Sequence, residues 1–508
     1  MPTLRMSHCL LPASHGEGVS SLVSGFATCP GLFYATPAED GILSRVRIPG
    51  GVLNSEQCRA IADLADRYGG GYVDVTNRAN LQIREIHTGI NSQVLKQLQD
   101  IGLGSRNAVV DHIRNIMTSP TAGIDPQELI DTRPFVQGWD NYIAANPTLS
   151  GLSAKFSVCF DGGGIVRVSD RLNDILFAAV LVHGDVYFRL HLSVGAKGQP
   201  PSDMGILLPP DDCLLVLAAL ADIYLAHTDI TSNRRLRLRE LLNTLGCENY
   251  LQEVEQRLPF LFFRSEIRKD LTPQPPSLPG KGERSKYQYI GIHPQLQKGL
   301  FYIGVVLPLG RVESKQMRGL ADLATKYGSG TLRLTPWQNL LLTDIPQQRL
   351  TDVENEIAFF GLDSSGTNIK SALVACSGNK GCAASATDTK THALALAEYL
   401  KNRIALEHPI NIHFSGCEKS CAQHSKSDIT LLGVNFEADD ETVESYHVYL
   451  GDSNNHKFGR EVYQYVTFSE LPALIVKILH TYKNNRLNIN ESFREFANRY
   501  PLMQPNPI

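Results

Sequence analysis

The chain has 508 residues, of which 43% are hydrophobic and 20% charged, and its formal net charge at pH 7 is −4. This length predicts about three domains with sizeable cores, and the slightly negative charge argues against a general nucleic-acid-binding protein. Ten cysteines in so long a chain do not make a disulfide framework. No signal peptide is visible, and the most apolar stretch, residues 214–221, is too short to span a membrane. We therefore expect a soluble, cytoplasmic protein in a reducing compartment.

After a loose extension over residues 1–27, the chain enters a unit that it contains twice. Residues 48–86 align without a gap onto residues 307–345 at a constant offset of 259, and 16 of the 39 positions are identical. Similarity over this length indicates an internal repeat. Because one such unit would be weak alone, we expect the two copies to pack side by side.

Each copy predicts a helix followed by a strand. Apolar residues recur at helical spacing, namely Ile61, Leu64, Ala65 and Tyr68 in the first copy and Leu320, Leu323, Ala324 and Tyr327 in the second. We expect each helix to end at a glycine C-cap, Gly69 and Gly328. The expected strands begin at Val73 and Leu332.

The next segment of the first copy, residues 76–84, alternates polar and apolar residues. As a strand it would place four polar side chains on one face, those of Arg78, Asn80, Gln82 and Arg84. That face is either a solvated sheet surface or part of a site for a polyanionic ligand, to which Arg114 and Lys155 add positive charge.

Between the two copies we expect a helix and a linker. Residues 234–258 alternate charges with Leu and predict a helix, and residues 272–287 are rich in Pro and Gly and predict a loose linker. The duplication extends further on each side of this linker. Residues 116–120 correspond to 374–378, and residues 160–162 correspond to 414–416, so the chain consists of two related halves.

The second half carries four cysteines in two close pairs. They are Cys376, Cys382, Cys417 and Cys421, spaced Cys-x5-Cys and Cys-x3-Cys with 34 residues between the pairs. Four thiolates suit an iron–sulfur cluster or zinc, and the x5 spacing disfavours zinc, with structural thiols as the third alternative. The other six cysteines are expected to pack as small hydrophobic residues, namely Cys9, Cys29, Cys58, Cys159, Cys213 and Cys247.

The residues around these cysteines predict loops at the ends of regular elements. Gly378 and Gly381 let the first loop bend tightly, and Asp388 can start a helix whose apolar face includes Leu396. Residues 410–414 alternate like a strand and lead directly into the second pair. Loops in such positions commonly hold cofactors.

Together, the cysteine spacing, the repeat and the segment Thr76-Asn-Arg-Ala-Asn-Leu-Gln-Ile-Arg84 resemble the nitrite and sulfite reductase superfamily over nearly the whole chain. The resemblance implies an α+β fold of two ferredoxin-like half-domains and two larger α/β domains of the sirohaem type. It implies that the four cysteines bind a 4Fe-4S cluster, with Cys421 also bridging to sirohaem iron where sirohaem is present. The implied substrate- or tetrapyrrole-binding residues are Arg78, Asn80, Gln82, Arg84, Arg114 and Lys155.

The implied domain limits follow the repeat. They are an extension over residues 1–27, a ferredoxin-like half-domain over 28–95, an α/β domain without a cluster over 96–271, the linker over 272–287, a second half-domain over 288–350, a cluster-bearing α/β domain over 351–500 and a tail over 501–508.

Within the superfamily, several segments resemble the precorrin-3B synthases of cobalamin biosynthesis, among them Cys29-Pro-Gly-Leu32 and Gly416-Cys-Glu-Lys-Ser-Cys421. Residues 123–135 resemble the nitrite reductases instead. The reductases carry a Pro-Arg-Lys-Trp/Phe-Asn/Lys segment where this chain has Ser153-Ala-Lys-Phe-Ser157, which weakens the case for anion reduction. The resemblance thus favours an oxidoreductase, a monooxygenase that hydroxylates and lactonises precorrin-3A with O2 and a 4Fe-4S cluster.

Two alternatives stay open. One is a ferredoxin-dependent nitrite or sulfite reductase with sirohaem, and the other is a non-catalytic tetrapyrrole- or cluster-binding redox protein. A second iron centre belongs to the oxygenase hypothesis, but its ligands are not identified, and His87, His112, His413 and His424 are more readily explained as surface or packing residues. The absence of a nucleotide-binding glycine fingerprint favours a separate electron donor, a ferredoxin or a flavoprotein. A monomer is expected, with neither nucleic acid nor membrane as a partner.

Overall fold

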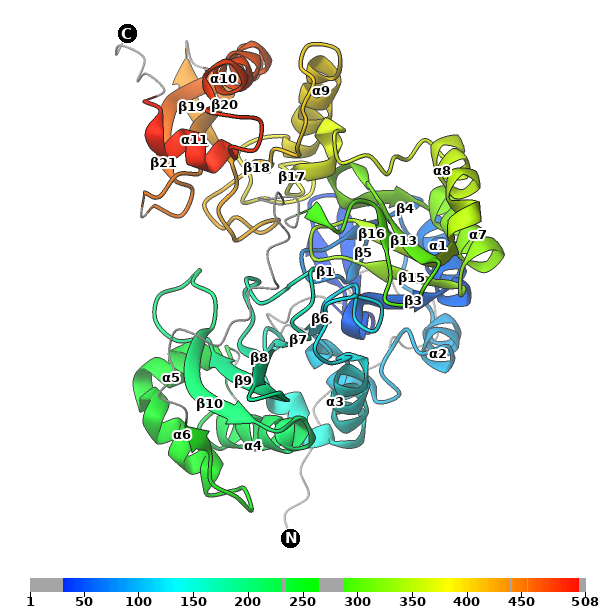
Figure 1. The fold of residues 1–508 in the computed structure, drawn as a ribbon, viewed down its shortest axis with the longest axis vertical. Helices are drawn as coiled ribbons and strands as arrows, with labels where there is room; N and C mark the ends of the chain where they lie inside the picture. Colours follow the sequence, from blue (N-terminus) through cyan, green and yellow to red (C-terminus); the bar gives the residue numbers. More distant parts are fainter. Residues whose placement is uncertain are drawn as a thin grey trace.

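The computed structural model describes residues 31–230, 232, 234–264, 287–438, 441–454 and 456–501. The N-terminal extension, nearly all of the predicted linker, the last residues of the tail, Cys9 and Cys29 lie outside these ranges. In the described part, the chain forms four β-sheets, two in a central body and one in each of two outer lobes (Figure 1). Of the helices described, none combines the length and the apolar composition that crossing a bilayer requires.

The central body contains the two copies of the repeat, and they exchange strands. The first sheet has the order β1 (Thr36–Ala38), β2 (Gly41–Val46), β5 (Leu81–Ile86), β4 (Tyr72–Val75) and β14 (Arg311–Glu313). The second has the order β12 (Gly291–Pro294), β13 (Leu300–Val305), β16 (Leu340–Pro346), β15 (Thr331–Leu334) and β3 (Val52–Asn54). Each sheet therefore ends in a strand that the other copy supplies, antiparallel to its neighbour.

The two repeat helices, α1 (Ser55–Tyr68) and α7 (Ser314–Tyr327), cover these sheets and pack against each other. Asn54 begins α1 with a capping box, since its side chain accepts from Gln57 N and the Gln57 side chain accepts from Asn54 N. One hydrophobic core contains the buried residues of both copies. The predicted side-by-side packing of the two copies is thus present, and α2 (Ser92–Asp100) and α8 (Leu350–Phe359) complete this layer.

Both helices end at the predicted glycine C-caps, and the N–H groups of Gly69 and Gly328 donate to the carbonyls of Ala65 and Ala324. Gly69 and Gly328 are extended, with φ of −114° and −120°. They are needed for space, because a Cβ on Gly69 would lie 2.7 Å from Ile83 Cγ2 and one on Gly328 would lie 2.3 Å from the Thr343 carbonyl oxygen. The left-handed conformation comes two residues later, at Gly71 (φ +76°) and Gly330 (φ +75°).

The outer lobes are built alike. The first has the sheet order β11 (Phe263–Arg264), β10 (Ser202–Leu208), β9 (Asp185–Leu192), β8 (Ile175–Val182), β7 (Val158–Asp161) and β6 (Ile116–Thr118). The second has the order β17 (Leu373–Ala375), β18 (Ile412–Ser415), β19 (Ile429–Ala438), β20 (Glu441–Leu450) and β21 (Arg460–Thr467). In both, the first three strands in chain order pair in parallel and the rest antiparallel. The extended duplication predicted from short matches is therefore visible as topology.

Helices complete each lobe at corresponding places in the chain. The first lobe contains α3 (Arg133–Ala145), α4 (Cys213–Ala226), α5 (Leu238–Leu245) and α6 (Cys247–Glu255), and the second contains α9 (Thr389–Lys401), α10 (Leu471–Asn485) and α11 (Phe493–Arg499). The single helix predicted over residues 234–258 was wrong. It is divided into α5 and α6 at Gly246, whose φ of +87° no α-helix allows.

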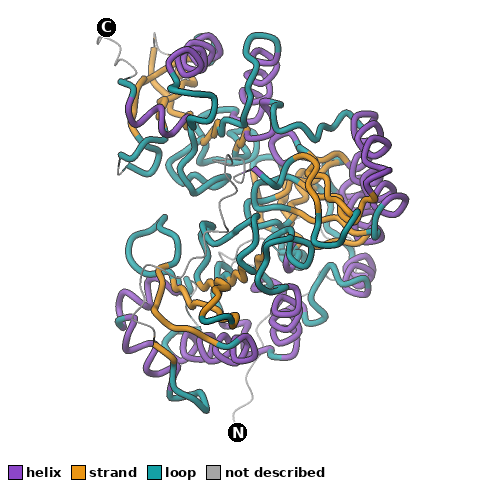
Figure 2. The backbone as a smooth tube through the Cα atoms, viewed as in Figure 1, coloured by secondary structure: helices purple, strands orange, loops and turns teal. Residues whose placement is uncertain are grey.

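Figure 2 shows both lobes on the same side of the central body, with loops filling the region between them. The loops after β6 and β7 in the first lobe, and after β17 and β18 in the second, follow parallel strands. Because both lobes lie on that side, side chains from both halves of the chain can meet there.

Candidate functional site

The four paired cysteines lie on two adjacent loops of the second lobe. Cys376 follows β17 directly, and Cys417 comes two residues after β18, which is the parallel neighbour of β17. The Gly416 N–H donates to Cys376 Sγ at 3.2 Å, which joins the two loops. Cys382 and Cys421 are exposed, whereas Cys376 and Cys417 are half-buried.

The thiol of Cys421 is influenced by all three of the others. Partial desolvation of the thiol by the surrounding protein raises its pKa, and the negative charges of Cys417, Cys376 and Cys382 raise it further. Each additional anion makes ionisation of the next harder, so a set of four thiolates requires a positively charged group among them. In the described parts of the chain, no three His, Cys, Asp or Glu side chains converge as the ligands of a single metal ion do. Binding of one cluster by the four thiols therefore stays a prediction.

Glycines determine the shape of both thiol loops. For the loop of Cys376 and Cys382, the sequence predicted this role. Gly378 has a φ of +70°, the left-handed conformation of a tight bend. Gly381 leaves room for Arg84, because a Cβ there would lie 2.6 Å from Arg84 Nη2. Gly416 meets Ser385 so closely that a Cβ would lie 1.7 Å from Ser385 Oγ. The two loops and the start of α9 thus pack so closely that residues larger than glycine do not fit at these positions.

Residues of the first half reach across to both thiol loops. Arg84 pairs with Asp40 through Nε–Oδ2 and Nη2–Oδ1 contacts of 2.7 and 2.9 Å, and its Nη2 donates to the Gly381 carbonyl at 2.7 Å. Asn77 Nδ2 donates to the Cys421 carbonyl at 3.1 Å. Residues of the first half, which lacks the paired cysteines, therefore hold the backbone at Gly381, next to Cys382, and at Cys421.

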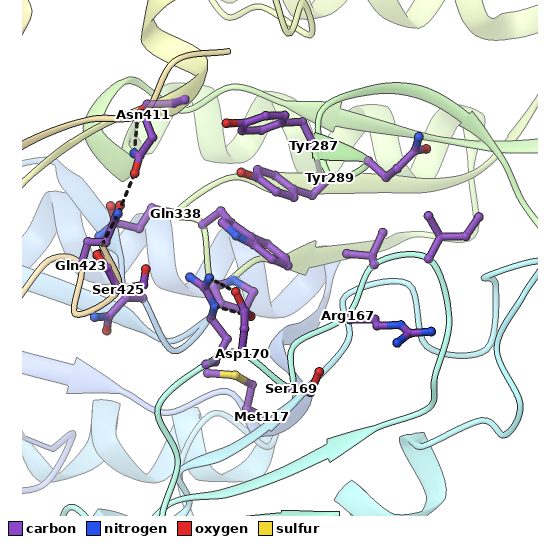
Figure 3. Close-up of a pocket in the computed structure, with 18 of the residues that line it drawn as sticks. Met117, Arg167, Ser169, Asp170, Tyr287, Tyr289, Gln338, Asn411, Gln423 and Ser425 are labelled. Atoms are coloured by element: carbon purple, nitrogen blue, oxygen red, sulfur yellow. Dashed lines mark hydrogen bonds and ion pairs between the residues drawn. The ribbon is translucent and has the colours of Figure 1, made fainter. Parts of the chain in front are cut away.

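A cavity of about 1120 Å³ opens beside the thiol loops, between the two lobes and the central body. Its wall includes Ala422, the residue immediately after Cys421, and Arg78 and Asn77 of the first repeat copy. Figure 3 shows Gln423 and Ser425 on the side of the thiol lobe, with Arg167 and Asp170 approaching from the first lobe. This volume slightly exceeds the usual range for small-molecule sites, so the cavity can hold a ligand of tetrapyrrole size.

Of the six predicted binding residues, the structure places only Arg78 in the cavity wall. The expected single strand face was wrong, because residues 76–80 form a turn with Ala79 at φ +53° and β5 begins at Leu81. Arg78 donates to the Leu172 carbonyl at 2.6 Å and to Asn173 Oδ1 at 2.8 Å. It is thus held at the cavity by the loop before β8.

The other five predicted residues serve different contacts. Asn80 accepts from Ile48 N at 2.8 Å and supports the turn. Gln82 is half-buried on β5. Arg84 lies at the thiol loop, and Arg114 is buried in a pair with Asp140, with an Nε–Oδ1 distance of 2.7 Å. Asn80, Gln82 and Arg84 therefore do not share a strand face with Arg78, and binding of one ligand by the six residues stays a prediction.

Lys155 is exposed, and its positive charge acts on His424, a residue of the cavity wall. The pKa of His424 is lowered to about 4, mainly by burial and also by the positive charges of Arg78, Lys197, Arg237 and Lys155. His424 lines the cavity three residues after Cys421. The cavity wall at His424 therefore lies among positive charges, which suits an anionic ligand.

Of the other three histidines named from the sequence, His413 is influenced by His424. His413 on β18 is fully buried, and its pKa is lowered to about 3, mainly by this burial and also by nearby His424. His112 is half-buried and its pKa is lowered to about 4, while His87 is exposed. A second iron centre among these residues stays unassigned.

The aromatic side of the cavity was missed from the sequence. Trp337 and Tyr289 stack with ring centroids 4.1 Å apart, and the Arg171 guanidinium lies 5.4 Å from the Trp337 ring. All three residues line the cavity, and Figure 3 shows Tyr289 facing into it beside Tyr287. The repeat offset of 259 pairs Trp337 with Arg78, so the alignment of the two copies held the signal that could have located this wall.

Comparisons with known proteins agree with this architecture. The family model described as "Nitrite/Sulfite reductase ferredoxin-like half domain" matches residues 36–101 and 293–360. The model described as "Nitrite and sulphite reductase 4Fe-4S domain" matches residues 109–262, the outer lobe that lacks the paired cysteines.

Similar proteins cover most of the chain. A chloroplastic ferredoxin–nitrite reductase of Zea mays is 32% identical over 437 residues, which cover 83% of this chain and 75% of the relative. A ferredoxin–nitrite reductase of Synechococcus elongatus is 28% identical, with 88% of each chain covered. The solved structure titled "Structure of Mycobacterium tuberculosis NirA protein" superposes with a TM-score of 0.73 at 23% identity, over 90% of this chain and 83% of that one. The predicted α+β fold with duplicated half-domains is thereby confirmed.

Proposed function

The chain belongs to the nitrite and sulfite reductase family, and on this premise we propose that it is a ferredoxin-dependent reductase of nitrite or sulfite that uses a 4Fe-4S cluster and sirohaem. It is an oxidoreductase by family. The observation that carries the proposal is the position of the cavity, which begins at the residue after Cys421 and has Arg78 in its wall.

The residues present fit these two groups. Four thiols, close enough for three of them to perturb the fourth, form the donor set of a 4Fe-4S cluster. A cavity of about 1120 Å³ whose wall at His424 lies among positive charges suits a flat macrocycle with several carboxylates. When bound, the cluster and sirohaem supply the electrons and the iron at which the oxyanion is reduced.

The protein's own groups then bind and orient the anion. Arg78 is fixed by the Leu172 carbonyl and the Asn173 side chain, so its guanidinium keeps one orientation in the cavity wall. Lys155, Lys197 and Arg237 add positive charge near His424. The electron donor in this proposal is a ferredoxin, supported by the printed names of the relatives that share most of the chain.

A second candidate function is the O2-dependent conversion of precorrin-3A to precorrin-3B. The observation that favours it is the environment of Ser157, whose N–H and hydroxyl both donate to Asp174 Oδ2, at 3.1 and 3.2 Å. Ser157 is uncharged and both of its donors go to Asp174, so this position offers no positive charge for binding a small anion. The relatives found are named nitrite reductases, so they support the reductase hypothesis better than this one.

Turnover by the full-length protein, purified without oxygen, separates the two. We expect oxidation of reduced ferredoxin to depend on added nitrite or sulfite and to give ammonium or sulfide. Consumption of precorrin-3A and O2 without any nitrite or sulfite reduction would overturn the reductase proposal in favour of the second. Turnover of neither substrate set by protein with a full cluster would leave a binding protein without catalysis.

A further inference from the structure

We propose that Arg84 and Asp40 form a positioning pair for the cysteine loop and set the electrostatic environment of the group that its thiolates hold. This inference rests on the proposed cluster and goes beyond it, because it assigns a role to an ion pair that lies outside the cavity. Neither residue contacts the proposed anion, so both are positioning residues.

The contact geometry is specific. The Arg84 side chain is 4% exposed and that of Asp40 16% exposed, and the pair is bidentate at 2.7 and 2.9 Å. The remaining donor of Nη2 reaches the carbonyl of Gly381, the residue before Cys382, at 2.7 Å. The buried guanidinium makes a bidentate pair with a carboxylate and donates one hydrogen bond to a loop carbonyl. Together these interactions hold the loop in one position.

The loop of Cys382 leaves space for the Arg84 side chain at Gly381. A Cβ on residue 381 would lie 2.6 Å from Arg84 Nη2 and 3.2 Å from Asp40 Oδ2, so any residue other than glycine would push the ion pair away. Glu444 also holds this loop, because it accepts from Asn379 Nδ2 at 2.7 Å and from Asp388 N at 2.9 Å. Cys382 thus sits on a segment fixed at both flanks.

A buried arginine of the second copy, at a different position of the repeat from Arg84, supplies a comparison. Arg333 is also 4% exposed, and its Nη1 donates to the carbonyls of Pro120 and Ala122 at 3.1 and 2.7 Å. Those carbonyls belong to the loop after β6, which corresponds to the loop after β17 but carries no cysteine. Arg333 therefore does for the thiol-free loop what Arg84 does for the thiol loop.

Arg84 and Asp40 carry opposite charges, so removing one or the other changes the local net charge in opposite directions. Arg84→Met leaves a carboxylate beside the thiol loop without its cation, which disfavours addition of an electron nearby. Asp40→Asn leaves the guanidinium uncompensated, which favours it. The reduction potential of an iron–sulfur cluster responds to local net charge and to hydrogen bonds. The two substitutions should therefore move the midpoint potential in opposite directions, which a purely structural role does not predict.

The test uses the full-length holoprotein and the variants Arg84→Met, Arg84→Lys, Asp40→Asn and, as the matched control, Arg333→Met. Redox titration followed by electron paramagnetic resonance should give a lower midpoint for Arg84→Met, a higher one for Asp40→Asn and the wild-type value for Arg333→Met. Against a competing iron chelator, Arg84→Met should retain its cluster about 10-fold less well, as expected for loss of a ligand-supporting contact, and Arg84→Lys should recover part of this loss.

Equal midpoints and equal retention in wild type and Arg84→Met would overturn the inference while leaving the cluster in place. Shifts of the same sign in Arg84→Met and Asp40→Asn would overturn the electrostatic part. If the wild-type protein itself bound no cluster, the proposed function would fail instead, so the two failures are distinguishable. Thermal unfolding of each variant identifies any that does not fold, and Arg84→Lys then carries the comparison.

Discussion

At the scale of single residues, the four paired cysteines are distinguished from the others by their surroundings. Cys58, Cys159 and Cys213 are buried, and burial raises their pKa values well above the ordinary one, so they pack as apolar side chains, as expected from their scattered positions. Cys382 and Cys421 are exposed on loops instead. Exposure of a thiol on a loop has no packing explanation.

We therefore predict that Cys382→Ser and Cys421→Ser each abolish cluster binding, because a serine hydroxyl does not replace a thiolate as a ligand of this kind. Acid-labile sulfide should fall from about four per chain to near zero in both variants. The control is Cys247→Ser, which changes a half-buried cysteine in the other lobe and should keep its full sulfide content. Wild-type sulfide in Cys421→Ser would contradict the ligand assignment.

A second residue-scale prediction concerns Glu128, at the edge of the first lobe. Its pKa is raised from 4.5 to about 7, mainly by burial and also by the charges of Asp131 and Asp125, against the Gly123 N–H, which lowers it. The folded state thus prefers the neutral carboxyl. Its stabilising contribution is complete below 4.5 and is lost as the pH rises past about 7.

Glu128→Gln should remove this loss. Urea unfolding at a series of pH values should show the free energy of unfolding of the wild type falling by about 1 kcal/mol across this interval, a value reduced for the partial exposure of the side chain. The variant should show a shallower fall across the same interval. Parallel curves for the two proteins would mean that Glu128 does not titrate there.

At the scale of elements, the interlocking of the thiol loops depends on one contact between Gly416 and Ser385. A methyl group on residue 416 would overlap Ser385 Oγ at 1.7 Å and lie 2.7 Å from its Cβ. We predict that Gly416→Ala displaces the Cys417 loop and lowers the cluster content several-fold. Adding Ser385→Gly removes both overlapping atoms and should restore most of the cluster, measured as iron and sulfide per chain.

The elements themselves were predictable where one local cause determined them. Apolar spacing located α1 and α7, and Asp388 marked the start of α9, where its side chain accepts from Thr391 N. Residues 76–84 failed because alternation of polarity was taken for a strand, whereas hydrogen bonds across the turn, such as that from Thr76 N to the Asn80 carbonyl at 2.8 Å, determine the backbone. Long-range partners such as Asp40 for Arg84 are not encoded in local periodicity.

At the scale of the whole molecule, the exchange of β3 and β14 makes the two halves depend on each other. Each central sheet takes its last strand from the other copy, and one hydrophobic core contains both. The repeat predicted that the copies pack together, but strand exchange has no signature in either copy alone. The domain limits drawn from the sequence divide the chain between these strands, and they stay a prediction.

We accordingly predict that residues 31–264 and 287–501 do not fold when produced separately. Each fragment would expose an unpaired strand edge and half of a shared core, which favours aggregation. Production of both fragments together should restore a soluble complex with the far-ultraviolet circular dichroism spectrum of the whole chain. A monomeric, cooperatively unfolding single fragment would show that the exchange does not couple the halves.

The cavity between the lobes is likewise a property of the whole molecule. The sequence located Arg78 and the thiol loops, because motifs mark them, but it could not locate Tyr289, Arg171 or Lys426, which reach the cavity only through the arrangement of four sheets. The family resemblance located the fold, whereas the choice between oxyanion reduction and precorrin oxidation depends on what the cavity holds.

The most direct test of the central claim is the ultraviolet–visible spectrum of the full-length protein purified without oxygen, recorded together with iron and acid-labile sulfide assays. The account predicts a Soret band and the long-wavelength bands of sirohaem, with about four sulfides per chain. About four sulfides and a broad shoulder near 400 nm without sirohaem bands would contradict the reductase proposal and favour the precorrin oxygenase. Iron-free and sulfide-free protein, even after reconstitution, would contradict the cluster assignment itself.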